Sequence, residues 1–339
     1  MTNMPQRTRR YLGPMLDSNY WDHFTPRDDD IIISTSMKAG TTWMQRICAA
    51  LVLQSAELEI PLDEYSPWVD MRISFPEVTQ PRLEAQTHRR FIKSHIPLDA
   101  LLFFDNVKYI VVGREGRDVM MSAYHHYLNM APHVYSMVNS HNSEQMFAAY
   151  EQLGMDLPPT MIEGIRNLNP WEGEDLPFWE DPDIHDFIHG WLTRGLYEGE
   201  LDGYPFWSHF RHLQSWWEYR HLPNIMFVHY ADLLADLSGE MRRISAFLDI
   251  NVNEEIWPSL VDAATFKTMK QNAEQTAPAL GLWRDTSKFF RQGTNGSWQD
   301  VMTDKENTLY EVAINRELDP DAIRWMVEGT KKAGDPGIS

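Results

Sequence analysis

Four short, strongly apolar runs are spaced along the chain, at residues 31–34, 90–94, 107–113 and 225–229. Runs of this length and composition are typical of strands that are buried on both faces, as in a parallel sheet. A segment with helical character follows each of these runs, most clearly at residues 42–54, 116–128 and 233–247. Repeated strand–helix units predict an α/β fold with a parallel central sheet flanked by helices. Ligands in such folds bind beyond the carboxyl ends of the strands.

Two stretches depart from this alternation. Residues 155–210 are rich in Trp, Phe, Pro, Asp and Glu, and they predict a partly helical insertion that covers the sheet as a lid or binding wall. The same aromatic side chains are also compatible with a secondary core. Residues 271–296 are similarly irregular, and the tail from Lys331 onward is expected to fray. Because no repeat or low-complexity linker divides the chain, residues 1–339 are predicted to be a single domain.

The overall charge narrows the class of partner. The chain carries 49 Asp and Glu against 30 Lys and Arg, for a net charge of -19. Such a molecule repels a polyanion, so nucleic acid is not expected as a partner, whereas a few buried cations can still hold a small anion.

The N-terminus lacks the apolar core of a signal peptide, and the apolar stretch 47–53 is too short to span a bilayer. With its single cysteine, Cys48, the chain is expected to be cytoplasmic.

The first apolar run continues into a candidate phosphate-binding loop, Thr35-Ser-Met-Lys-Ala-Gly-Thr-Thr-Trp43. Small residues let the backbone N–H groups of such a loop point toward an anion, and the following helix adds its positive end. Lys38 supplies a full charge. A standard nucleoside-triphosphate P-loop has its lysine directly after the last glycine, whereas Lys38 precedes Gly40. A strand, turn and capped helix without a ligand is the alternative for this segment taken alone.

Two other predicted strand ends carry cations. Arg114 ends the third run, and its guanidinium can make bidentate hydrogen bonds to a phosphate. Ser122 follows about two helical turns later. Taken alone, this pattern also fits a helix with a surface ion pair. Lys93 and His95 end the second run, and residues two apart face the same side of a strand. His95 is therefore a candidate general base, although a single histidine is more often structural.

Together these segments resemble the motifs of the sulfotransferase family that uses 3′-phosphoadenosine 5′-phosphosulfate (PAPS). The loop resembles T-x-P-K-S-G-T-T-W, with Met37 and Ala39 in place of Pro and Ser, and the other two segments resemble K-T-H-[LI]-P and R-x-x-R-D-x-x-x-S. Three later segments, which begin at Tyr230, Thr265 and Phe290, resemble Y-E-D-[LM], S-F-x-x-M-K and R-K-G-x-x-G-D-W. The resemblance covers about residues 31–298 and implies the P-loop-kinase-like sulfotransferase fold.

The resemblance also implies roles for individual residues. It places His95 as the base, Lys38 and Lys93 as the cations for the leaving phosphate and the transferring group, and Ser122 as a restraint on Lys38. Arg114 and Ser122 would hold the 3′-phosphate. In the late loop Gln292 stands where the family has Lys, so we expect weaker nucleotide binding. The full set implied to bind the nucleotide is Lys38, Ala39, Gly40, Thr41, Thr42, Trp43, Arg114, Ser122, Tyr230, Thr265, Phe266, Met269, Phe290, Arg291, Gln292 and Gly293.

The resemblance predicts a transferase that moves a sulfuryl group from PAPS to a hydroxyl of a small, partly apolar acceptor, leaving the product PAP and requiring no metal. His185 and His189 lie four apart, a spacing that here is more typical of an exposed helix face than of a metal site. Of the family's dimer motif only Thr303 remains, so the oligomeric state is left open. Two alternatives also stay open, a nucleotide kinase and a non-catalytic nucleotide-binding protein of the same fold.

Overall fold

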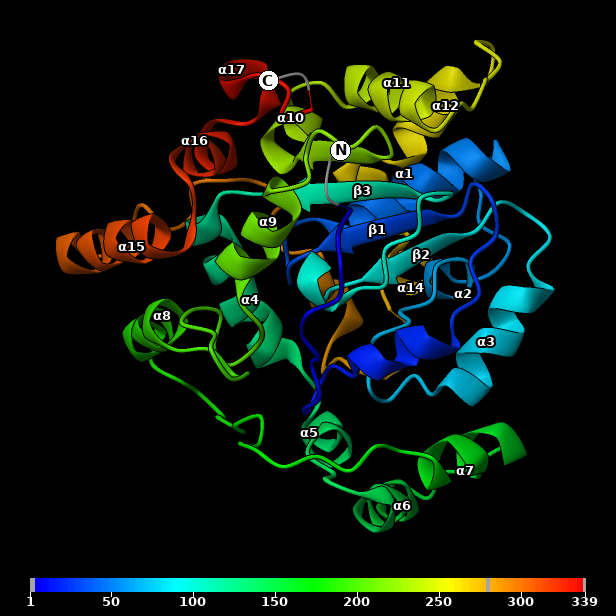
Figure 1. Cartoon of the computed structure of the whole chain (residues 1–339), viewed down its shortest axis with the longest axis vertical. Helices are drawn as coiled ribbons and strands as arrows, with labels where there is room; N and C mark the ends of the chain where they lie inside the picture. The colour runs from blue at the N-terminus through cyan, green and yellow to red at the C-terminus, as the bar shows by residue number, and fades with distance from the viewer. Residues whose placement is uncertain (1–3, 279–280, 338–339) are drawn as a thin grey trace.

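The computed structural model describes residues 4–278 and 281–337. Four parallel strands form a central sheet in the order β2-β1-β3-β4 (Figure 1). The strands are β1 (Ile31–Thr35), β2 (Phe91–Ser94), β3 (Lys108–Gly113) and β4 (Ile225–His229). All four apolar runs are strands of one parallel sheet, so the predicted fold class is confirmed.

The sheet is covered on both faces, as the uninterrupted apolar strands predict. Successive strand residues point to opposite sides, so Ile31 and Ile33 lie in one buried cluster and Ile32 lies in the other. The first cluster is completed by α1 (Thr41–Leu53), α11 (Leu237–Phe247) and α12 (Trp257–Ala263). The second is completed by α4 (Gly116–Asn129) and α9 (His209–Trp217), together with parts of the C-terminal helices (Figure 1).

The other helices connect and surround these layers. Those before β4 are η1 (Ser18–His23), α2 (Leu62–Tyr65), α3 (Pro76–Ala85), η2 (Leu98–Ala100), α5 (Pro132–Val138), α6 (Ser143–Gln152), α7 (Pro159–Arg166) and α8 (Ile184–Thr193). Those after β4 are α10 (Tyr230–Ala235), α13 (Phe266–Gln271), α14 (Ala273–Thr276), η3 (Thr286–Phe289), α15 (Asp304–Glu317), α16 (Pro320–Glu328) and α17 (Thr330–Ala333).

The helix predicted at residues 233–247 is divided in two at Asp236. This residue leaves the helical region, with φ −158° and ψ 77°, and its carboxylate accepts a hydrogen bond from the backbone N–H of Gly239. A carboxylate in this position caps the start of a helix, because it satisfies an N–H that has no partner within the helix. The single-helix prediction was therefore wrong, and α10 and α11 are separate elements.

The aromatic segment 155–210 divides its side chains between two environments. Trp191, Trp207 and Phe210 are buried in the core that packs on the α4 side of the sheet. Met155 and Met161 line the cavity described below. Most of the large aromatic side chains of this segment therefore contribute to the core.

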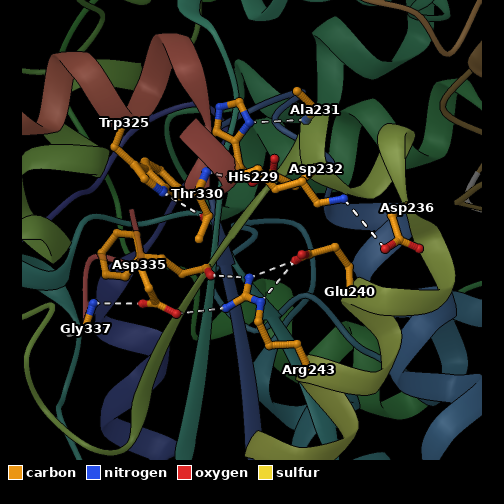
Figure 2. Close-up of polar contacts among 12 residues, drawn as sticks. His229, Ala231, Asp232, Asp236, Glu240, Arg243, Trp325, Thr330, Asp335 and Gly337 are labelled. Carbon is orange, nitrogen blue, oxygen red and sulfur yellow. Dashed lines mark hydrogen bonds and ion pairs between the residues drawn. The ribbon is translucent and has the colours of Figure 1, made fainter. Parts of the chain in front are cut away.

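The C-terminal tail is docked and does not fray within the described residues. Figure 2 shows Thr330 between the indole of Trp325, which donates to its hydroxyl at 3.0 Å, and Asp232, which accepts from its backbone N–H at 2.7 Å. Asp335 lies 3.6 Å from the guanidinium of Arg243 (Figure 2). These contacts order residues 330–337, so the prediction of fraying from Lys331 was wrong there; residues 338–339 lie outside the described part.

Candidate active site

A cavity of about 430 Å³ lies at the carboxyl ends of the strands, where an α/β fold places its ligands. The loops after β1, β2 and β3 line it together with Pro278 and residues of segment 282–297. Two residues of the predicted site lie elsewhere: Ala39 is buried in the core, and Thr265 caps α13 with its hydroxyl. The predicted residues that line the cavity are Lys38, Gly40, Thr41, Thr42, Trp43, Lys93, His95, Arg114, Ser122, Tyr230, Phe266, Met269, Phe290, Arg291, Gln292 and Gly293.

The loop between β1 and α1 has an unusual backbone. Lys38 adopts φ +64°, which is uncommon for a residue with a side chain and is a feature of functional sites. Gly40 follows with φ +126°, and an added Cβ there would lie 3.1 Å from the ring of Tyr230. A glycine at position 40 therefore lets the chain turn tightly into α1 while Tyr230 closes one side of the loop.

Arg114 joins this loop to the late segment of the chain. Its guanidinium donates to the Lys38 carbonyl at 3.3 Å, to the Thr294 carbonyl at 3.0 Å and to the Asn295 side chain at 3.2 Å. The guanidinium carbon lies 4.0 Å from the centre of the Tyr230 ring, a stacked cation–π contact. One side chain at the end of β3 thus connects two loops that are far apart in sequence.

The late loop folds against α13 and the start of α4. Gly293 has φ +65°, and an added Cβ would lie 2.4 Å from the Phe266 ring, so the backbone must approach that ring closely. The N–H of Gly296 donates to the Asp118 carboxylate at 2.7 Å, and Lys270 donates to the Arg291 carbonyl at 3.1 Å. These contacts hold the loop over the cavity and bring Arg291 to its edge.

His95 is buried at the end of β2, and within residues 4–278 and 281–337 no hydrogen bond is made by its Nε2. Its Nδ1 lies 2.7 Å from the Thr35 carbonyl oxygen, which can only accept, so Nδ1 carries the proton and Nε2 keeps its lone pair. Trp68 and Trp207 pack on the ring, with centroid distances of 4.7 Å and 5.2 Å. Burial, and after it the charge of Lys93, hold the pKa of His95 well below its usual value. The imidazole is therefore neutral and able to accept a proton at neutral pH.

Asp70 organises the surroundings of His95, and sequence reasoning missed it. Its buried carboxylate accepts hydrogen bonds from the indoles of Trp21 and Trp68, the Ser94 hydroxyl and the His95 backbone N–H. The amine of Lys93 lies 4.2 Å from the centre of the Trp68 ring. Burial lowers the pKa of Lys93 to about 8. Asp70 thus holds Trp68 in contact with both His95 and Lys93, and no sequence motif marks it.

Lys38 extends from its loop to α4, where His126 receives it. The Lys38 Nζ lies 3.3 Å from the His126 Nδ1 and 4.5 Å from the centre of the Phe289 ring. Burial, followed by the charges of Arg114 and Lys93, lowers the pKa of Lys38 to about 7. The resemblance pairs Lys38 with Ser122, whereas here its hydrogen bond is made to His126; Ser122 lines the same cavity.

Three further features considered in the sequence are His185, metal binding and membrane-spanning helices. His185 lies at the surface and pairs with Glu306 at 2.9 Å, which raises the pKa of His185. Within residues 4–278 and 281–337, no cluster of three His, Cys, Asp or Glu side chains is arranged to hold a metal ion. Over the same ranges, none of the helices is both long enough and apolar enough to cross a membrane.

The arrangement suits transfer of a group from an anion to a hydroxyl. Lys38, Lys93, Arg114 and Arg291 are among the basic side chains that line one cavity on a protein whose net charge is -19. A neutral base, His95, lines the same cavity. Cations in a site with little water stabilise charge that develops on a leaving group far more strongly than they would in water.

Comparison with known proteins agrees with this chemistry. A family model described as the sulfotransferase domain matches residues 28–320. A glycolipid sulfotransferase of Mycobacterium tuberculosis is 35% identical over 336 residues, covering 96% of this chain and 96% of the relative. Sulfotransferase 1A1 of Rattus norvegicus is 27% identical over 327 residues, covering 94% of this chain and 92% of the relative.

Solved structures show the same fold. Mouse sulfotransferase SULT7A1 complexed with PAP superposes with a TM-score of 0.61 at 21% identity, over 91% of this chain and 92% of that chain. Retinol dehydratase in a complex with retinol and PAP gives a TM-score of 0.60 at 21% identity, over 89% and 84%. At this identity the likeness speaks for the fold alone. The family model and the near full-length relatives show that this chain belongs to the sulfotransferase family of enzymes.

Proposed function

We propose that the enzyme transfers the sulfuryl group of PAPS to a hydroxyl of a partly apolar acceptor, with His95 as the general base. The observation that carries this proposal is the buried His95 ring, which is neutral, keeps the lone pair of its Nε2 and lines the same cavity as Lys38 and Lys93. A base of this kind accepts the proton that the acceptor hydroxyl loses as it attacks.

The donor assignment rests on two separate sets of groups suited to phosphates. The loop around Gly40, with Lys38 and the start of α1, would hold the 5′ end of the nucleotide. Arg114, Ser122 and Arg291 line the same cavity and would hold the 3′-phosphate. A nucleotide with phosphates at both the 3′ and the 5′ position of its ribose matches two such sets, whereas a nucleoside triphosphate matches one. When bound, PAPS supplies the activated sulfuryl group.

The cations would act on charge that develops during transfer. Lys38 is the candidate for the bridging oxygen of the leaving phosphate, and Lys93, beside His95, for the transferring group. Both amines are buried, so each is worth more electrostatically than in water but also loses its proton more readily. Transfer is therefore expected to slow in alkaline solution, as first Lys38 and then Lys93 becomes neutral.

The acceptor would lie in the apolar part of the cavity. Side chains of methionine and other apolar residues from several segments form this wall, and unbranched thioethers adapt to acceptors of different shape. Met155 and Met161 are the contribution of segment 155–210. The relatives at 35% identity are glycolipid sulfotransferases, which favours an amphiphilic acceptor with a hydroxyl on its polar part. The remaining wall includes Met15, Met71, Phe75, Met130, Val134, Met137 and Leu282.

The test combines a substitution with two readouts. His95→Ala is expected to abolish sulfuryl transfer from labelled PAPS while the affinity for PAP, measured by calorimetry, stays within a few-fold of wild type. His88→Ala, at a histidine packed on Tyr65 and Phe91 outside the cavity, is the matched control and should keep turnover. Retained turnover in His95→Ala would remove the base assignment.

The acceptor and the two open alternatives need a second experiment. The wild-type enzyme is offered phenols, sterols, sugars, long-chain alcohols and glycolipids with labelled PAPS, and separately ATP with Mg²⁺. Transfer to an amphiphilic hydroxyl supports the proposal. Phosphoryl transfer from ATP would favour a kinase, and PAP binding without transfer to any acceptor would favour a non-catalytic nucleotide-binding protein.

A further inference from the structure

His126 lies in the wall of the active-site cavity and belongs to none of the motifs that mark the site in the sequence. It sits on α4, and its Nδ1 is 3.3 Å from the Lys38 Nζ. The imidazole is held in place by aromatic neighbours, with centroid distances of 4.5 Å to Trp283 and 5.9 Å to Phe289. Lys38 is thus bound between a ring nitrogen and the face of Phe289, 4.5 Å from its centre.

The direction of this hydrogen bond defines the state of both side chains. When Lys38 is protonated its ammonium group only donates, so the His126 Nδ1 then accepts, and the neutral imidazole carries its proton on Nε2. Burial, and then the nearby charges of Lys38 and Lys93, hold the pKa of His126 well below its usual value. The ring therefore remains an acceptor across the neutral pH range, and it interacts better with the charged form of Lys38 than with the neutral form.

We propose that His126 is a positioning residue that holds the Lys38 ammonium against α4 while the donor site is empty, and releases it to the anionic donor. The proposal rests on the function proposed above, since it requires an anionic donor at Lys38. Ser122 precedes His126 by one helical turn, and residues four apart lie on the same helix face. Lys38 can therefore move along α4 without leaving polar partners, because Ser122 lines the same cavity.

Without His126, the Lys38 amine would lose its proton more readily. The charged groups around it are Arg114 at the end of β3 and Lys93 on β2, and both disfavour its protonated form. His95, at the end of β2, and His126 itself are neutral. The Nδ1 of His126 and the Phe289 ring are the contacts that favour the ammonium. Removing the Nδ1 acceptor lowers the pKa of Lys38 below its present value of about 7, so Lys38 loses its charge at a lower pH.

The experiment measures PAP affinity by calorimetry between about pH 5 and pH 9 in the wild-type protein and three variants. Wild-type affinity should fall as pH rises through the pKa of Lys38, because a neutral Lys38 attracts the 5′-phosphate less. In His126→Phe, which keeps an aromatic ring against Trp283, this fall should move to lower pH by about one unit, the size expected for one hydrogen bond to a charged group. His126→Gln keeps an acceptor oxygen and should restore the wild-type midpoint.

The PAP affinity of His126→Phe at low pH distinguishes a positioning role of His126 from a mere loss of packing. Below both midpoints, His126→Phe should bind PAP at least as tightly as wild type, because Lys38 no longer has to leave His126. A variant that only disturbs packing would bind more weakly at every pH, and that result would overturn the proposal. His125→Phe, at a neighbouring histidine that faces the charge of Arg291, should leave the midpoint in place.

The outcome also separates this inference from the proposed function. If wild-type protein does not bind PAP at any pH, the donor assignment fails. If wild-type protein binds PAP but the profiles of His126→Phe and wild type coincide, the donor assignment stands and the role of His126 is refuted.

Discussion

Replacing Arg114 by lysine tests whether the two loops of the nucleotide site depend on one side chain. The substitution keeps the positive charge but removes the planar set of donors that reaches three acceptors at once. Lysine can reach one of these acceptors, so two hydrogen bonds are lost. The stacking of the guanidinium on Tyr230, at 4.0 Å, is weakened as well.

The expected size follows from these contacts. Arg114 is only 7% exposed, so its hydrogen bonds are shielded from water. Two hydrogen bonds at about 1 kcal/mol each and a cation–π contact of about 0.5–1 kcal/mol sum to about 2.5–3 kcal/mol. If this energy holds the loops in the conformation that binds the nucleotide, its loss weakens PAP binding by on the order of 100-fold.

Calorimetric titration of PAP into Arg114→Lys gives the affinity, and thermal unfolding gives the stability. Arg117→Lys is the matched control, since Arg117 also bonds two side chains and stacks on Trp298 at 3.7 Å but does not line the cavity. It should lower the unfolding temperature and leave PAP affinity nearly unchanged. An Arg114→Lys affinity within about threefold of wild type would refute the reasoning, because the hydrogen bonds and stacking of the Arg114 guanidinium would then contribute little to PAP binding.

Two further substitutions probe single contacts. Gly293→Ala places a Cβ 2.4 Å from the Phe266 ring at φ +65°, which costs about 1–2 kcal/mol in backbone strain alone. We expect the KM for PAPS to rise about tenfold or more and the unfolding temperature to fall by a few degrees. An unchanged KM would show that the loop is not part of the site. Asp70→Asn replaces an acceptor of four hydrogen bonds by a group that must also donate, so it should cost about 2–3 kcal/mol of stability and lower kcat more than PAP affinity. Equal losses in kcat and affinity would argue against its role at His95.

The sequence predicted those parts of the fold that depend on local pattern. Each strand is an apolar run buried on both faces, so its position can be read from consecutive residues, and all four runs proved correct. Local pattern was insufficient at Asp236, where a carboxylate caps a new helix inside an apparently continuous helical segment. It was also insufficient for the tail, whose order depends on Asp232 and Arg243, about a hundred residues earlier.

The same division applies to the active site. Motifs at strand ends located Lys38, His95 and Arg114, because parallel strands bring their carboxyl ends to one edge of the sheet independently of how the loops fold. The partners that set the state of these groups come from other segments. Asp70 reaches the His95 backbone from 25 residues away, and His126 reaches Lys38 from 88 residues away. The sequence by itself therefore determined which chemical groups meet at the sheet edge. Only tertiary packing decided their charge and orientation, because pKa and hydrogen-bond direction depend on burial and on neighbours that are distant in the chain.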